Sequence, residues 1–234
     1  MGIPQLDTML NGGLPKGHSV LVLGPSGTGK TILGTTYLAE GARRGGKGVM
    51  AFFDQGNSRS RNAELAKLAE SNSVSIVESR SFDLSIEEIL DDLVHEITRT
   101  GATRVVIDAL SELALYLAPE FAQDFRGSVF KILATLARLS VSVVLTIGQE
   151  DSFANQHFGR ADTAFLADAI IALRYVEMEG CMTKVMSVVK VRGSNHSSDL
   201  HQYAITDAGI NIDERPMKYE GLLSGHPSPI TPHL

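Results

Sequence analysis

The chain has 234 residues, 43% of them hydrophobic, and its 21 Lys+Arg against 27 Asp+Glu give a net charge of −6. A chain of this size and composition can bury one large core, which predicts a single α/β domain. The negative charge argues against nucleic acid as the main partner, although a local basic groove is compatible with it. The only cysteine, Cys181, excludes an internal disulfide. Together with the lack of an apolar run long enough to span a bilayer, it predicts a cytoplasmic protein that does not enter the membrane.

Apolar residues alternate between strand-like and helix-like patterns along most of the chain. The pattern predicts strands at 18–23, 48–53, 74–78, 104–108 and 141–147, and helices at 31–41, 85–98 and 125–139. The helix at 85–98 is the clearest, because Ser85 and Glu88 form a capping box ahead of apolar residues spaced three and four apart. Such alternation predicts a mainly parallel sheet with helices on both faces.

The pattern changes after Gly148. Residues 149–160 are polar and without periodicity, which predicts a flexible loop. Strands at 169–175, 183–191 and 201–205, joined by short turns, predict a C-terminal antiparallel hairpin region. The segment 214–234 holds half of the prolines and is expected to be an extended, partly ordered tail. The predicted organisation is a domain at 1–213 followed by this tail.

Residues 24–31 form a complete G-x-x-x-x-G-K-[ST] phosphate-binding loop between a predicted strand and a predicted helix. In such a loop, backbone N–H groups converge on phosphate oxygens, Lys30 reaches the β/γ-phosphates and the Thr31 hydroxyl holds Mg²⁺. The alternative is a chance glycine-rich turn, which the strand before it and the helix after it disfavour. The motif therefore predicts a site for a nucleoside triphosphate made of Gly24, Pro25, Ser26, Gly27, Thr28, Gly29, Lys30 and Thr31.

Asp108 ends the β-branched strand at 104–108, as an acid that orients Mg²⁺ and its water would. The carboxyl ends of parallel strands meet at one edge of a sheet, so we expect Asp108 beside Gly24. An ordinary strand-ending aspartate is the alternative. Paired with the phosphate-binding loop, the metal role is favoured, with Thr31 and Asp108 as the ligands.

These motifs together resemble the KaiC-like branch of the RecA superfamily of ATPases, over nearly the whole chain. The opening Gly2-Ile-Pro is similar to the family's entry to its loop, and Val106-Ile-Asp-Ala-Leu-Ser-Glu-Leu113 to its Walker B segment. The most specific match is Val189-Lys-Val-Arg-Gly-Ser-Asn-His196, which resembles a segment that reaches the nucleotide of the neighbouring subunit. The resemblance implies a RecA-like fold, ATP as ligand and a hexameric ring.

The late segment supports this interpretation on physical grounds. Lys190 and Arg192 alternate in an extended stretch, so both should lie on one side and repel each other unless they share an anion. A γ-phosphate presented across an interface is a suitable anion, and an Arg acting in trans is a recurring device in phosphoryl transfer. Ser194 and His196 are candidates for contacts to ribose or base. The alternative is a solvated basic strand.

The chain departs from the family pattern where catalysis would occur. Family members carry two adjacent glutamates after the second strand, whereas here Asp54 and Gln55 follow it. Asp54 keeps a carboxylate but is one methylene shorter, and a misplacement of about 1 Å can cost roughly a hundredfold in rate. The expectation is slow ATP hydrolysis with Asp54 as general base and Lys30 on the phosphates, or ATP binding without useful turnover. An Asx turn with Asn57 and Ser58 is the alternative role for Asp54.

A second departure concerns self-phosphorylation, because the acceptor positions of clock-type members correspond to Ala164 and Phe165, which cannot carry phosphate. The leading hypothesis is a ring-forming ATPase whose nucleotide state controls assembly or a partner protein. The alternatives are a non-hydrolysing ATP-binding scaffold and a RecA-type DNA-binding recombination factor. The last is disfavoured because the expected DNA loops at 149–165 contain a single fixed cation, Arg160.

Overall fold

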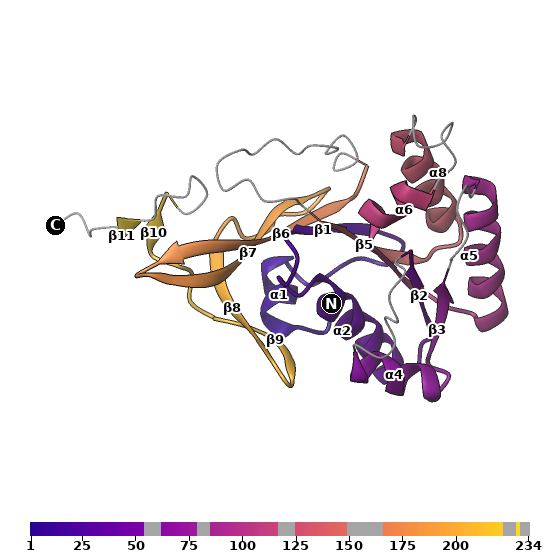
Figure 1. The fold of residues 1–234 in the computed structure, drawn as a ribbon, viewed down its shortest axis with the longest axis horizontal. Coiled ribbons are helices and arrows are strands. Elements are labelled where there is room, and N and C mark those ends of the chain that lie inside the picture. The colour runs from indigo at the N-terminus through magenta and orange to yellow at the C-terminus, as the bar shows by residue number, and fades with distance from the viewer. Residues whose placement is uncertain (54–61, 79–84, 117–124, 149–165, 222–227, 230–234) are drawn as a thin grey trace.

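The computed structural model describes residues 1–53, 62–78, 85–116, 125–148, 166–221 and 228–229. Within these ranges the main sheet has nine strands, running in space in the order β3-β2-β4-β5-β1-β6-β7-β8-β9 (Figure 1). Their bounds are β1 Ser19–Gly24, β2 Gly48–Phe52, β3 Val74–Glu78, β4 Arg104–Asp108, β5 Ser142–Gly148, β6 Ala169–Met178, β7 Cys181–Val191, β8 Leu200–Thr206 and β9 Gly209–Ile212. The pairings from β3 to β6 are parallel, and those from β6 to β9 are antiparallel.

Helices cover both faces of the parallel part, as Figure 1 shows. The described helices are α1 Pro4–Met9, α2 Lys30–Arg43, α4 Ala63–Glu70, α5 Ile86–Thr100, α6 Leu110–Tyr116 and α8 Phe125–Arg138. Helices α1, α2 and α4 pack on one face, and α5, α6 and α8 on the other. None of the helices in the described ranges is both long and apolar enough to cross a membrane.

Strand β1 lies inside the sheet and is buried along its whole length. Its side chains alternate between the two cores: Val20 and Val22 pack with α1 and α2, whereas Leu21 and Leu23 pack with α5 and α8. A strand that is buried on both faces has a continuous run of apolar residues in its sequence, and such a run allows β1 to be predicted. The end of β1 at Gly24 carries the phosphate-binding loop.

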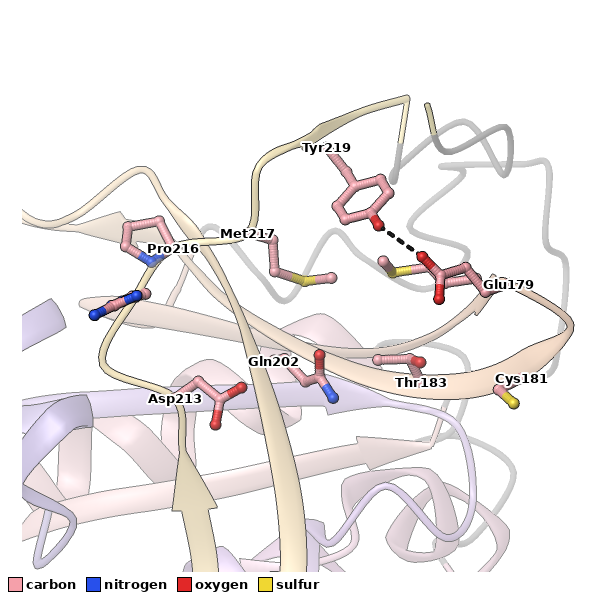
Figure 2. A pocket seen from close by; sticks show the side chains of 10 residues that line it. Glu179, Cys181, Thr183, Gln202, Asp213, Pro216, Met217 and Tyr219 are labelled. Atoms are coloured by element: carbon pink, nitrogen blue, oxygen red, sulfur yellow. Dashed lines mark hydrogen bonds between the residues drawn. The ribbon is translucent and has the colours of Figure 1, made fainter. Parts of the chain in front are cut away.

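Strands β7 to β9 continue the sheet beyond β6, with β9 packing on α2, and the chain then folds back over this part. The backbone N–H of Met217 donates to the carbonyl of Leu200 at 2.8 Å, and the Tyr219 hydroxyl donates to Glu179 at 3.2 Å (Figure 2). A cavity of about 430 Å³ on this outer side is lined by Met178, Glu179, Cys181, Thr183, Gln202, Asp213, Arg215, Pro216, Met217 and Tyr219. A two-stranded ribbon, β10 Tyr219–Glu220 with β11 Ser228–Pro229, follows.

The α/β class, the mainly parallel sheet and the C-terminal antiparallel region are confirmed, and each predicted strand and helix overlaps an observed one. Helices α1, α4 and α6 and strand β9 were not predicted. The predicted loop at 149–160 and the acceptor-equivalent positions 164 and 165 lie outside the described residues. The division between a domain at 1–213 and a tail remains a prediction.

Candidate functional site

The predicted phosphate-binding loop connects β1 to α2 at the carboxyl edge of the parallel strands. Gly24 pairs in register with Gly148 at the end of β5, and Phe52 of β2 pairs with Asp108 at the end of β4. The sheet therefore brings the loop, Asp108 and the end of β5 to one edge. Ligands of open parallel sheets bind at this edge.

Two glycines give the loop a shape that other residues would not adopt. Gly27 has φ +79° and Gly29, the N-cap of α2, has φ +96°. A Cβ on Gly27 would lie 2.8 Å from the Tyr175 hydroxyl, and one on Gly29 would lie 2.9 Å from Ile205 Cδ1. The left-handed backbone conformation at these glycines turns N–H groups of the loop toward one concave side. A concave arrangement of N–H groups is suited to binding an anion.

The Lys30 ammonium lies against its own loop and donates to the carbonyls of Gly24 and Pro25, both at 2.8 Å. Burial lowers its pKa, and the carboxylates of Asp108 and Glu112 partly offset that effect by attraction. A desolvated ammonium held by two carbonyls is ready to move to phosphate oxygens, because these are stronger acceptors. The contact with the β/γ-phosphates that the motif predicts for Lys30 remains a prediction.

Asp108 is brought into direct contact with the loop helix. One of its oxygens accepts from the Thr31 hydroxyl at 2.6 Å, and the other accepts from the Thr146 hydroxyl. Asp108 is only 8% exposed. One carboxylate and one hydroxyl oxygen suit Mg²⁺, which usually keeps waters and phosphate oxygens as its remaining ligands. No cluster of three or more His, Cys, Asp or Glu that could hold a metal occurs among the described residues.

Glu112 is an acid at this edge that the sequence argument did not single out. It lies in the first turn of α6, and its carboxylate accepts from the Ser111 hydroxyl at 2.9 Å. The same hydroxyl accepts from the backbone N–H of Gly148 at 3.3 Å. The signal available in the sequence was its position four residues after Asp108, inside the Walker B-like segment.

Lys190 and Arg192 lie at the opposite end of the sheet from the loop. Val20, near the start of β1, pairs with Ala169, and Ala169 pairs with Val191. Four residue steps along β1 separate Val20 from Gly24, a distance of about 13 Å along the strand. The structure therefore does not bring these two cations to the phosphate-binding loop of their own chain.

Lys190 and Arg192 both lie against the segment that leads into β6, in agreement with their expected placement on one side of an extended stretch. The Lys190 ammonium donates to the Ala167 carbonyl at 2.8 Å, and the Arg192 guanidinium contacts the Asp168 carboxylate at 3.5 Å. The other oxygen of Asp168 is held by the Ser19 N–H and hydroxyl. Burial, and then Arg192, lower the pKa of Lys190, while Asp168 raises it. Asp168 is thus an anion within the chain that both cations face.

The remaining predicted residues are placed as follows. Ser194 is exposed, with its hydroxyl donating to the Asn195 carbonyl at 3.0 Å and accepting from Asn11 at 3.4 Å. His196 is partly buried in the loop between β7 and β8. Both lie with Arg192, away from the phosphate-binding loop. Asp54 lies outside the described residues, so its predicted role as base remains a prediction.

Comparison with known proteins agrees with these features. The family description "ATPase: KaiC" matches residues 1–217. Circadian clock oscillator proteins KaiC from Rippkaea orientalis and Prochlorococcus marinus are 29% and 26% identical over 98% of this chain, which spans 45% and 47% of their lengths, about half. The crystal structure of a KaiC-like protein from Pyrococcus horikoshii OT3 superimposes with a TM-score of 0.77 at 25% identity, covering 91% of this chain and 96% of that one. The chain belongs to the KaiC family of ATPases.

Proposed function

We propose that this protein is a slow Mg²⁺-dependent ATPase that assembles into a ring with ATP at the subunit interfaces and regulates a partner protein by its nucleotide state. The observation that carries the proposal is the separation of two predicted halves of one site. The loop with Lys30, Thr31 and Asp108 lies at one end of the sheet, and Lys190 and Arg192 lie at the other.

Two complementary surfaces at opposite ends of one subunit favour a head-to-tail contact. Repetition of such a contact produces a ring if the rotation between subunits closes. In that arrangement, the Lys190 and Arg192 of one subunit approach the phosphates held by the loop of the next. The Arg192 guanidinium contacts Asp168 at 3.5 Å, which is long for a charge-assisted hydrogen bond, and a phosphate of the neighbouring subunit is the second anion proposed for it. A hexamer is the ring size that the resemblance implies.

Within each site, the residues of this chain have distinct roles. The loop N–H groups and Lys30 bind the β- and γ-phosphates, and Thr31 with Asp108 holds Mg²⁺, which neutralises phosphate charge when it is bound. Asp54 is proposed as the base that orients the attacking water. Ser194 and His196 approach the ribose or base from the neighbouring subunit.

The proposal is tested by combining solution mass with phosphate release. We expect Mg-ATP to convert smaller species into a ring, and phosphate to appear over hours. Lys30→Ala should abolish phosphate release, because it removes the charge that binds the phosphates. Lys16→Ala, an exposed lysine outside the loop, is the matched control. A wild-type chain that neither assembles nor shows an ATP-dependent thermal shift would contradict the proposal.

A non-hydrolysing ATP-binding scaffold is the second candidate, and the substitution of Asp54-Gln55 for two glutamates favours it. Its signature is a thermal shift with ATP and a nucleotide-dependent mass without phosphate release, since a ligand that binds only the folded state stabilises it. Salt-sensitive retention on single-stranded DNA would instead favour the recombination-factor hypothesis.

A further inference from the structure

Two tyrosine hydroxyls hold the phosphate-binding loop from behind. Tyr203 on β8 donates to the Thr28 carbonyl at 2.7 Å, and Tyr175 on β6 donates to the Ser26 carbonyl at 3.5 Å. The first bond is the shorter and the better shielded, because Tyr203 is 3% exposed and Thr28 is fully buried. These carbonyls belong to alternate residues of the loop.

Each bond fixes a peptide plane that also carries a loop N–H. In a trans peptide, the carbonyl of one residue and the N–H of the next point in opposite directions. Tyr203 therefore orients the N–H of Gly29, and Tyr175 orients that of Gly27. Both glycines have positive φ and no Cβ, so their peptide planes rotate more easily than those of other residues.

The strand that carries Tyr203 also covers the loop with an apolar side chain. Ile205, two residues along β8 and therefore on the same face, would lie 2.9 Å from a Cβ at Gly29. Burial, and then the nearby Tyr175, raise the pKa of Tyr203. Its hydroxyl thus remains a hydrogen-bond donor at every pH at which the protein would be studied.

We propose that Tyr203, with Tyr175 as a weaker second contact, is a positioning residue that keeps the loop N–H groups directed at the phosphates. It touches neither nucleotide nor metal and acts through the Thr28 carbonyl. The inference rests on the proposed function, because it assumes that the loop binds phosphate. It assigns to the C-terminal antiparallel strands a part in binding the nucleotide of their own subunit.

The test is Tyr203→Phe, which removes the hydroxyl and keeps the ring. Loss of one neutral hydrogen bond predicts a decrease of about three- to tenfold in affinity for ADP. Inorganic tripolyphosphate, which has no base or sugar, should lose affinity by the same factor. Amide hydrogen exchange in the peptide covering the loop should become faster in the ADP-bound protein.

Tyr37→Phe is the matched control. Its hydroxyl is also in the core and donates to the Ser142 carbonyl at 3.4 Å, away from the loop, so ADP affinity should stay unchanged. Tyr175→Phe should give a smaller loss than Tyr203→Phe, and it serves as the test if the latter does not fold.

Unchanged affinities for both ligands in a folded Tyr203→Phe protein would overturn the role of Tyr203 and leave the proposed function standing. A loss of ADP affinity with unchanged tripolyphosphate affinity would also overturn it, because the residue would then act on the base or sugar. Failure of the wild-type chain to bind either ligand would overturn the proposed function as well.

Discussion

Asp108 owes its orientation to two threonines, one on each side. Thr31 comes from the loop helix and Thr146 from β5, and each hydroxyl donates to a different carboxylate oxygen. Thr31 is a predicted Mg²⁺ ligand, so its hydroxyl is expected to leave Asp108 partly for the metal. Thr146, which is fully buried, is then the contact that keeps the carboxylate in place.

Thr146→Val keeps the shape of the side chain and removes its hydroxyl. One oxygen of the buried Asp108 carboxylate would lose its partner, so the free energy of unfolding should fall by about 1–3 kcal/mol in urea titrations. More Mg²⁺ should also be needed for half-maximal ATP binding. Thr135→Val on α8, whose hydroxyl accepts from Arg138 at 3.4 Å, is the control. A urea midpoint equal to that of the wild type would refute the role given to Thr146.

Among the elements, α5 is the helix whose sequence specifies it most completely. The Ser85 hydroxyl accepts from the Glu88 N–H at 3.1 Å, and the Glu88 carboxylate accepts from the Ser85 N–H at 2.8 Å. Gly101, with φ +69°, ends the helix in the left-handed region. Its apolar residues face the core shared with β2, β4 and α8.

Ser85→Ala should lower the free energy of unfolding by about 1 kcal/mol, because it leaves one of the first N–H groups of α5 without its acceptor. The Thr98→Ala variant changes an exposed residue of the same helix and should not lower the free energy of unfolding, because Ala favours the helix more than Thr does. Urea titration of both variants measures the difference. Equal stabilities would mean that solvent replaces the cap at no cost.

The elements that the sequence did not predict are short or depend on distant contacts. Helices α1, α4 and α6 have six, eight and seven residues, too few for apolar periodicity to be distinctive. By contrast, the loop, Asp108 and the late cations belong to local patterns that the sequence displays directly, and their functional roles stay predictions. Tyr203 escaped notice because its partner, Thr28, lies 175 residues away, and a lone tyrosine in a strand is most often a core residue.

On the scale of the whole molecule, the reversal of strand direction after β6 determines where the predicted functional groups lie. Parallel strands place the loop and Asp108 at their carboxyl ends, whereas antiparallel β7 returns Lys190 and Arg192 to the other end. β8 then runs back and presents Tyr203 to the loop. One continuous segment, residues 190–203, thus joins the surface proposed to contact a neighbour to the loop of its own subunit.

This separation makes the proposed ring testable by mixing two defective subunits. Lys30→Ala removes the phosphate contact within a subunit, and Arg192→Ala removes the contact offered to its neighbour, so each variant alone should lose most phosphate release. An interface is complete when the intact loop of an Arg192→Ala subunit meets the intact Arg192 of a Lys30→Ala subunit. In rings co-assembled from equal amounts of both variants, about a quarter of the interfaces have this arrangement.

Phosphate release in the mixture should therefore recover to about a quarter of the wild-type rate, measured on rings of confirmed mass. Sites completed within one subunit would show no recovery, because neither variant would contain a complete set of residues. Arg126→Ala, an exposed arginine on α8, in place of Arg192→Ala provides the control. The Arg126→Ala variant by itself should release phosphate at the wild-type rate. Mixed with an equal amount of Lys30→Ala, it should release phosphate at about half that rate, because half of the loops are intact. Recovery confined to the Lys30→Ala and Arg192→Ala pair would require that a loop and an arginine from different subunits act on the same nucleotide.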